Sequence, residues 1–208
     1  ADGGTVAFLW RCVSHESIYR YIYHRIAQND YWHRLLPRKK HRRGQRGRRG
    51  GSSVRTIKHR VSIEKRPAFI DRRKQAGHWE ADYLLFRRHG QSVLVAQERA
   101  SRFIRLGKPP SRHAARTSVY LQRWLKPLPA QLRRTLTQDN GTEFADHYRL
   151  RDRLGIKTYF CHPHSPWEKG GIENMNGRLR RALPRSMDLS SLSPQALRAI
   201  ADRYNHTP

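Results

Sequence analysis

Three acidic residues occupy positions from which their carboxylates could act together. The chain has only 16 Asp and Glu residues against 43 Lys and Arg residues, so the place of each acid is informative. Asp82 lies in the middle of a predicted strand, and Asp139 lies in the turn sequence QDNG at residues 138–141. Glu173 lies in the first turn of a predicted helix, beside its apolar stripe. We expect these three acids, from three separate elements, to converge at one rim of a sheet.

Clustered carboxylate oxygens select hard, octahedral cations such as Mg²⁺ or Mn²⁺. Two such ions about 3.5 to 4 Å apart bridge a scissile phosphate, activate a water or a 3′-hydroxyl and stabilise the leaving oxygen. Plainer explanations are that Asp139 is a turn former and that Glu173 favours a helix N-terminus. Glu80 and Glu143 are the nearest other carboxylates, and either is a candidate for a supporting role around the ions.

The segments around these acids predict a mixed sheet. Trp79 and Tyr83 alternate with Glu80 and Asp82, which is the period-two signature of a strand with two different faces. Five segments have the pattern of strands: residues 77–86, 92–100, 102–107, 133–138 and 156–161. Short polar turns join the first three of them, which therefore predict an antiparallel meander.

Helices are predicted between and after the later strands. Apolar residues recur at helical spacing in residues 113–125 and 144–155, in a helix opened by the loop 162–171, and in residues 193–205. The buried stripe of the third helix is predicted to consist of Ile172, Met175, Leu179 and Ala182. The order of elements predicts an α/β (α+β) fold, with a mixed five-stranded sheet and flanking helices.

Positive charge is concentrated before residue 77. The formal net charge is +27, and residues 38–60 carry 11 cations, four glycines and no acid. Because like charges repel and glycine adds chain entropy, we expect a flexible basic linker over residues 37–76. Phosphate backbones neutralise such an arm with release of counterions, whereas a solubilising or localisation tail is the alternative. The predicted DNA contacts in the arm are Arg42, Arg43, Arg46, Arg48 and Arg49.

The N-terminal region, residues 1–36, is predicted to contain one short amphipathic helix from about residue 14 to residue 27. Ser14 is a suitable N-cap, and Ile18, Ile22 and Ile26 recur at four-residue steps. The polar face suits a helix laid on DNA, and packing against another element is the alternative. No apolar run approaches the roughly 20 residues of a membrane span. We therefore expect a soluble, cytoplasmic protein with no membrane partner.

Five segments carry motifs that match a known family. They are RVSIEKRPAFIDRR (60–73), GHWEAD (77–82), TQDNGTEF (137–144), CHPHSPWEKGGIENMNGRLRRALP (161–184) and YNHTP (204–208). Together they resemble the DDE transposases of the insertion sequence 30 family, within the retroviral-integrase superfamily. The resemblance runs from about residue 13 to residue 208, with 33 residues between Asp139 and Glu173.

This resemblance implies an RNase H-like catalytic core over residues 77–208. It implies that Asp82, Asp139 and Glu173 form a catalytic triad that binds two Mg²⁺ ions, for which Mn²⁺ can substitute. The implied enzyme is a polynucleotidyl transferase and endonuclease that cuts and joins double-stranded DNA, at transposon ends and target, without a covalent protein intermediate. The implied setting is bacterial and nucleoid-associated, and two DNA ends imply a homodimer.

The helix of Glu173 carries further candidate contacts. Gly177 follows Glu173 by four residues and Arg180 follows it by seven, so the three lie along one helix face. The predicted DNA contacts of this helix are Asn174, Asn176, Arg178 and Arg180, and for the two asparagines a plain surface role is the alternative. Trp167 either stacks on a base or packs under its loop, and packing is the favoured expectation.

Two features depart from the family pattern. Ala81 stands where glycine is usual, beside the first aspartate. Residues 13–23 resemble the last helix of the family's DNA-binding region, but residues 1–12 do not continue that region upstream, and YNHTP is where such proteins usually continue. We expect a catalytic core truncated at both ends, and the alternative function is a catalytically inactive DNA-binding remnant.

Overall fold

The computed structural model describes residues 13–24, 27–36, 57–163 and 165–207. The chain falls into two compact units, residues 1–49 and 50–208. The first unit contains α1 (His15–Ile22) and the 3₁₀ helices η1 (Ala27–Asp30) and η2 (Trp32–Leu35). The predicted cap is confirmed, since the Ser14 side chain accepts a hydrogen bond from the Ser17 amide.

Helix α1 is shorter than the sequence pattern predicts, because it ends at Ile22 rather than at residue 27. Its isoleucines and tyrosines are weak helix formers, so little intrinsic propensity extends the helix further. The helix has no buried residue, and Ile18 is 46% exposed. Ile22 is half-buried and α1 contacts η1, so the apolar stripe of α1 is only partly covered within this unit.

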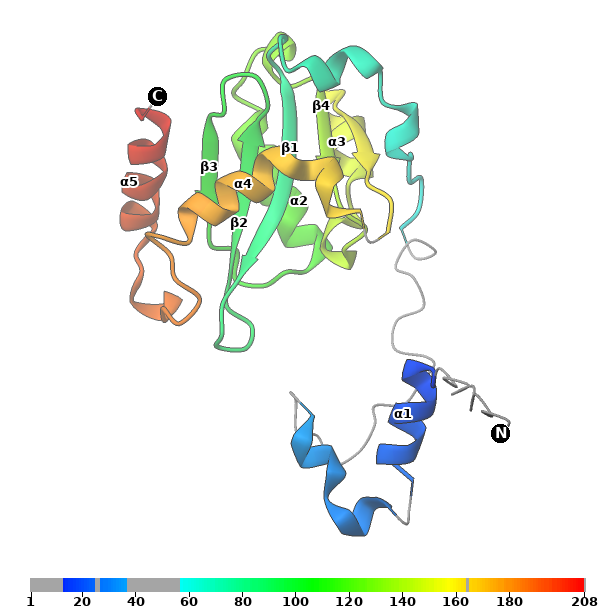
Figure 1. Cartoon of the computed structure of the whole chain (residues 1–208). Coiled ribbons are helices and arrows are strands. Elements are labelled where there is room, and N and C mark those ends of the chain that lie inside the picture. The colour runs from blue at the N-terminus through cyan, green and yellow to red at the C-terminus, as the bar shows by residue number, and fades with distance from the viewer. Residues whose placement is uncertain (1–12, 25–26, 37–56, 164, 208) are drawn as a thin grey trace, which may run out of the picture. The chain divides into compact units, whose positions relative to one another are not determined.

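The second unit is built on a five-stranded sheet with strand order β3-β2-β1-β4-β5 (Figure 1). The strands are β1 (His78–Leu85), β2 (Ser92–Glu98), β3 (Ile104–Gly107), β4 (Thr135–Gln138) and β5 (Lys157–Phe160). Strands β1, β2 and β3 pair antiparallel, whereas β4 pairs parallel with β1 and with β5. This arrangement confirms the mixed sheet and the antiparallel meander.

Helices cover both faces of the sheet, as expected of an RNase H-like core. They are α2 (Ala114–Leu125), α3 (Tyr148–Leu154), α4 (Gly170–Leu179) and α5 (Pro194–Asn205). Figure 1 shows α4 crossing one face and α2 and α3 on the other, with α5 beside β3. Among the residues that the structure describes, no helix has the length and apolar character needed to cross a membrane.

Strand β1 is buried on both of its faces. Trp79, Ala81 and Tyr83 belong to the apolar cluster that includes residues of α2 and α3. Leu84 belongs to a second cluster, with residues of α4 and α5. The alternation predicted for this strand is confirmed, and it places Asp82 on the face that α4 covers.

Residues 57–76 pack against this core instead of forming part of a flexible linker. Ile57 is 4% exposed and Ile70 is 2% exposed, and Ser62 forms a bridge with Phe160 of β5. The guanidinium of Arg66 donates a hydrogen bond to Thr137 Oγ1 at 2.9 Å. The core thus begins before the expected limit at residue 77, because isolated apolar residues in a basic sequence find partners on the sheet. Five predicted contacts lie outside the described residues: Arg42, Arg43, Arg46, Arg48 and Arg49.

Gly77 fixes the start of β1 beside β4. Its φ is +98°, and an added Cβ would lie 2.3 Å from the carbonyl oxygen of Gln131. The Gly77 carbonyl accepts hydrogen bonds from the amides of Arg134 and Thr135. Only glycine fits this positive φ and close approach, which set the register between the two strands.

Candidate active site

The register of β1 and β4 accounts for the nearness of Asp82 and Asp139. The last paired residues of these parallel strands are Glu80 and Thr137. Each aspartate lies two residues beyond its member of that pair, so the two side chains leave the sheet at the same level and on the same face. This is the rim at which the sequence predicts the acids to meet.

The ammonium group of Lys169 lies between the two carboxylates. Its Nζ is 3.4 Å from Asp82 Oδ1 and 3.3 Å from Asp139 Oδ2. The Lys169 side chain is 5% exposed, against 22% for Asp82 and 45% for Asp139. Burial alone would lower the pKa of Lys169, but the attraction of the two carboxylates outweighs it and raises that pKa above its usual value.

The protonation of Asp82 responds to the same neighbours. Burial raises the pKa of Asp82, Lys169 opposes the rise and Asp139 adds to it. The Asp82 carboxylate accepts hydrogen bonds from the Tyr83 amide at 2.8 Å and from Asn176 Nδ2 at 3.0 Å. Asn176, predicted as a DNA contact, therefore orients a carboxylate in the structure.

The two oxygens of the Asp139 carboxylate have different partners. Its Oδ1 accepts a hydrogen bond from the Gly141 amide at 3.0 Å, as a turn former does. Its Oδ2 is the oxygen that faces Lys169. The turn therefore presents one carboxylate oxygen to the site and holds the other.

Glu173 lies on the helix face that borders this pair of aspartates. It is exposed in the first turn of α4, four residues after Lys169 and three before Asn176, both of which contact Asp82. Residues at such spacings share one helix face. Within the described ranges, however, no three His, Cys, Asp or Glu side chains are grouped closely enough to hold a metal ion. The three-carboxylate metal site therefore stays a prediction.

Glu80 anchors α4 to the sheet. It is 1% exposed, and its Oε2 accepts a hydrogen bond from the Ile172 amide at 2.9 Å. Its Oε1 pairs with Arg99 Nη1 at 3.2 Å. A carboxylate at a helix N-terminus is favourable for the helix dipole. Glu80 thus supports the site by fixing the first turn of α4, which carries Glu173.

Glu143 is a further carboxylate near the aspartates. Burial raises the pKa of Glu143, and the charges of Asp139 and Asp82 raise it further. Its Oε1 lies 3.8 Å from Arg112 Nη1. This rim therefore contains more negative charge than Lys169 alone neutralises, which favours the binding of cations.

The loop from β5 to α4 is fastened by His162. The His162 amide donates to Glu168 Oε2 at 2.7 Å, and the ring nitrogens lie 2.6 Å from Glu168 Oε1 and 3.0 Å from Glu64 Oε1. The hydrogen bonds and charges of these two glutamates raise the pKa of His162. Because Glu168 precedes Lys169, this arrangement holds the lysine backbone in place.

The Asp139 turn is fastened from the opposite side by Arg60. Arg60 Nε donates to Asn140 Oδ1 at 2.7 Å, and Asn140 Nδ2 donates to the Cys161 carbonyl at 2.7 Å. These bonds connect the segment before β1, the turn after β4 and the end of β5. Arg60 lies at the end of the basic arm, and the sequence did not single it out.

Trp167 and Arg180 have surroundings that differ from those predicted from the sequence. Trp167 is 72% exposed, so the favoured expectation that it packs under its loop is wrong. Arg180 Nη2 donates to the Leu85 carbonyl at 2.8 Å, and its guanidinium lies 5.1 Å from the centroid of the Phe86 ring. Arg180 therefore joins the end of α4 to the end of β1.

Comparison with curated proteins found relatives along nearly the whole chain. The transposase for insertion sequence element IS1086 of Cupriavidus metallidurans is 40% identical over 198 residues, 94% of this chain and 58% of that protein. The transposase for IS4351 of Bacteroides fragilis is 32% identical, over 94% of this chain and 60% of that protein. Transposase InsI for IS30A of Escherichia coli K12 is 31% identical, over 94% and 52% respectively.

The alignments cover nearly all of this chain but only part of each relative. The chain spans between 52% and 60% of these three relatives. No family model matches the chain. The relatives therefore show common ancestry along 94% of this chain. The activity of this chain is inferred from the residues of its own candidate site.

Proposed function

Because the chain belongs to the insertion sequence 30 family of transposases, we propose that it carries the catalytic part of a DNA transposase. The proposed reaction is divalent-metal-dependent cleavage and strand transfer of double-stranded DNA, at the ends of a mobile element and at its target. One observation carries the proposal: the carboxylates of Asp82, in β1, and Asp139, directly after β4, both lie within 3.3 to 3.4 Å of the Lys169 ammonium. The proposed working form is a homodimer, since two ends must be held.

The residues at this rim suit a hard divalent cation. The donors are carboxylate oxygens, which Mg²⁺ and Mn²⁺ prefer, and two of them already hold a positive charge. We include Glu173 as the third ligand, because it lies on the α4 face between two residues that contact Asp82. Two bound ions would supply stabilisation of the charge that develops on a scissile phosphate and an activated oxygen nucleophile.

Three other residues, Lys169, Asn176 and Glu80, hold the carboxylates and the helix of Glu173 in position. Lys169 holds Asp82 and Asp139 together against their mutual repulsion, and Asn176 orients the second oxygen of Asp82. Glu80 fixes the first turn of α4 through the Ile172 amide. A site whose ligands are positioned before its substrate arrives loses little free energy to reorganisation during the reaction.

DNA is the partner that the charge of the chain favours. A net charge of +27 attracts a polyanion, and the basic segment 38–60 supplies sites for counterion release. Trp167, in the loop that leads to Lys169, is 72% exposed. An exposed aromatic side chain next to a basic surface is suited to stacking on a nucleic-acid base. We therefore assign Trp167 to DNA contact.

A second function, DNA binding without cleavage, is favoured by one observation. The position between the aspartates is taken by Lys169, and among the described residues no three carboxylates are grouped closely enough to hold a metal ion. A site that keeps this ion pair would not bind the metal ions, and the chain would bind DNA and leave it intact. Metal-dependent nicking separates the two functions.

The test is nicking of supercoiled plasmid and cleavage of duplexes with the element's terminal repeats, with Mg²⁺ or Mn²⁺. The change is Asp139→Asn, and the matched control is Asp152→Asn on the exposed surface of α3. Loss of a metal ligand removes several kcal/mol of transition-state stabilisation, so cleavage should fall by about 10²- to 10³-fold.

Measurement of DNA affinity shows whether a loss of cleavage results from a loss of DNA binding. Asp139→Asn should bind DNA at least as tightly as the wild type, because it removes a negative charge from the rim. Asp152→Asn should cleave as the wild type does. Cleavage that survives Asp139→Asn would refute the site, and a wild-type chain that binds DNA but never nicks it would establish the second function.

A further inference from the structure

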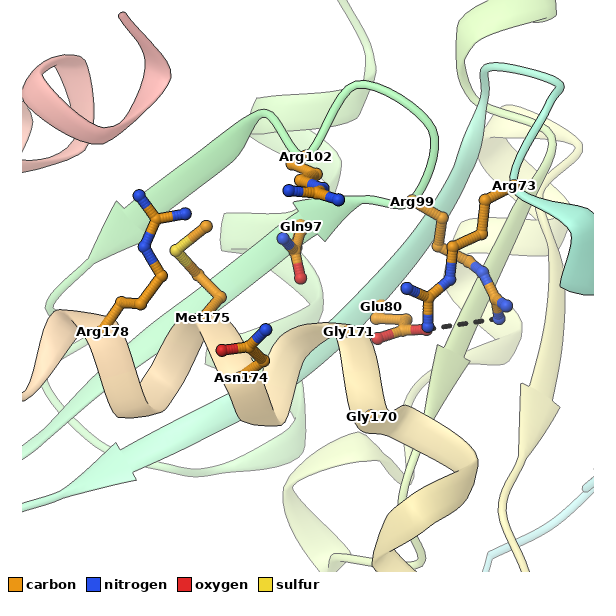
Figure 2. Close-up of a pocket in the computed structure, with 10 residues that line it drawn as sticks. All are labelled: Arg73, Glu80, Gln97, Arg99, Arg102, Gly170, Gly171, Asn174, Met175 and Arg178. Carbon is orange, nitrogen blue, oxygen red and sulfur yellow. Dashed lines mark ion pairs between the residues drawn. The ribbon is translucent and has the colours of Figure 1, made fainter. Parts of the chain in front are cut away.

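A basic cavity lies beside α4, on a different face of that helix from the one that borders the aspartates (Figure 2). Its volume is about 70 Å³. The lining arginines come from three parts of the fold, the segment before β1, the end of β2 with the turn that follows it, and α4: Arg73, Arg99, Arg102 and Arg178. Residues 174 and 178 of α4 point toward the cavity, whereas residues 169, 173 and 176 face or border the aspartates.

The cavity carries more positive charge than its surroundings neutralise. Its one carboxylate, Glu80, pairs with Arg99 Nη1 at 3.2 Å, and Arg99 also pairs with Asp71. Among the described residues, no carboxylate pairs with the other three arginines. The like charges of these arginines around one cavity repel one another, and a bound anion would offset that repulsion.

Two buried side chains have polar atoms without partners at this cavity. Arg99 is 7% exposed, and its Nε has no hydrogen-bond acceptor. Gln97 is 5% exposed, and its Oε1 has no donor. Buried polar groups are almost always hydrogen-bonded, so these two indicate a missing partner. A ligand with acceptor oxygens satisfies Arg99 directly, and a rotated Gln97 amide presents its NH₂ group to the same ligand.

The backbone at two of the arginines is held in an unfavourable conformation. Arg73 has φ of 53° and Arg102 has φ of 62°, in the left-handed region that non-glycine residues seldom adopt. Arg73 follows the 3₁₀ helix η5 (Ala68–Arg72), and Arg102 lies in the turn between β2 and β3, so the chain turns sharply at both residues. In Figure 2, the Arg73 side chain extends toward Glu80 and the start of α4.

Gly171 forms the wall of the cavity at the start of α4. A Cβ at this position would lie 3.0 Å from Glu80 Oε2 and 3.6 Å from Arg73 Nη2 and Gln97 Oε1. Any side chain here would therefore enter the space between these three groups. The glycine keeps that space open next to the amides of the first helical turn, where anions are favoured.

The volume of the cavity indicates the size of the ligand that it can hold. At roughly 10–15 Å³ for each water, 70 Å³ holds about five waters, and a phosphate group has five heavy atoms. We propose that this cavity binds one phosphodiester of the DNA strand that crosses α4 on its way to the aspartates. The ligand identity rests on the proposed function, whereas the anion-binding chemistry rests on the cavity alone.

The experiment uses the double variant Arg73→Gly/Arg102→Gly. Glycine prefers the left-handed backbone of both positions, so the variant removes two charges without opposing the fold. The matched control is Arg198→Ala/Arg203→Ala, which removes two charges from exposed positions of α5. Binding of a DNA duplex is followed by fluorescence anisotropy in EDTA at several salt concentrations, so that no cleavage occurs.

In the pocket variant, the slope of log K against log salt should become shallower by about 1, the value for one lost phosphate contact. The control should keep the wild-type slope. In a second arm, inorganic phosphate at constant ionic strength should raise the unfolding temperature of the wild type and of the control, but not of the pocket variant.

The outcomes separate this inference from the proposed function. Equal slopes for the pocket and control variants would overturn the phosphodiester assignment, even in a chain that cleaves DNA. A response to inorganic phosphate with an unchanged DNA slope would likewise overturn it, because the cavity would then take a free anion. A reduced slope in a chain that never nicks DNA would support the cavity and refute the transposase activity.

Discussion

Replacing Lys169 by Met tests whether the two aspartates form a cation site. Methionine has nearly the length of lysine and no charge, so the change removes the ammonium that lies 3.4 Å from Asp82 and 3.3 Å from Asp139. Two carboxylates then remain close together without a counter-charge. The matched control is Lys157→Met, at an exposed position of β5.

The magnitude follows from the distances and the exposure. At an effective dielectric constant of 20, each attraction is about 5 kcal/mol, and several kcal/mol of this is offset by the burial of the ammonium. Because the carboxylates of Asp82 and Asp139 are 22% and 45% exposed, water replaces part of what Lys169 supplies. We expect a net destabilisation of about 2 kcal/mol, which lowers the unfolding temperature by about 4–8 °C in a chain of this size.

Divalent cations should reverse this loss. A metal that binds only the folded state stabilises it by about 2.7 kcal/mol at 100 times its Kd. In the wild type the metal competes with the ammonium, so Lys169→Met should respond to Mn²⁺ at lower concentrations than the wild type does. The assay is thermal unfolding across a Mn²⁺ titration, with Ca²⁺ and Na⁺ as comparisons at matched ionic strength.

Two results would refute this reasoning. An unfolding temperature of Lys169→Met equal to that of Lys157→Met would show that the ammonium does not hold the carboxylates. A destabilised variant that no divalent cation restores would show that the carboxylates, although near each other, do not form a metal site. The second result would leave DNA binding without cleavage as the function.

Two further predictions concern the fold that carries the site. Burial lowers the pKa of His147, whose Nε2 donates to the Lys58 carbonyl, so the folded state holds it neutral. The contribution of His147 to stability should therefore be constant above pH 6.5 and fall as the pH drops below that value. His147→Gln should make the dependence of the urea midpoint on pH less steep between pH 6.5 and 5.5, and an unchanged slope would contradict this. Gly77→Ala should cost about 1–3 kcal/mol more than Gly90→Ala, because both glycines have positive φ but only at Gly77 would a Cβ meet a backbone oxygen. Equal losses in urea unfolding would mean that the Gln131 carbonyl moves aside.

Much of the sheet was predictable because burial leaves a periodic trace in the sequence. The alternation of Trp79 and Tyr83 with Glu80 and Asp82 matches the two faces of β1 as the structure has them. Three members of the predicted stripe, Ile172, Met175 and Leu179, are buried in α4, whereas Ala182 lies beyond the end of the helix and is half-buried. These patterns are local, and local patterns suffice where one face of an element is apolar.

Other features depend on contacts between distant residues and leave no local trace. Residues 57–76 resemble a linker because their charge is high, yet Ile57 and Ile70 pack into the core. Lys169 is one of 43 basic residues, and its burial between two aspartates depends on residues that are distant from it in the sequence. Its position four residues before Glu173 was the one available signal, since that spacing puts both on one helix face.

The candidate site itself was only partly predictable. The motif QDNG places Asp139 correctly at the end of β4, but the partner of its free oxygen comes from α4. Glu80 was considered as support for metal ions, and it instead accepts a hydrogen bond from the first turn of α4. Such partners are chosen by tertiary packing, which a single sequence does not encode residue by residue.

The pairing of β1 with β4 determines where this fold can gain or lose residues. Each aspartate is two steps beyond the pair of Glu80 and Thr137, so deleting Ala81 would send the carboxylate through the sheet to the side of α2. At Gly90, in the turn between β1 and β2, a Cβ would touch nothing within 4 Å. An insertion in this turn would leave unchanged the number of residues between the Glu80–Thr137 pair and each aspartate. Length variation compatible with activity should therefore collect in the turns and avoid the few residues that lead from Gly77 to Asp82 and from Thr135 to Asp139.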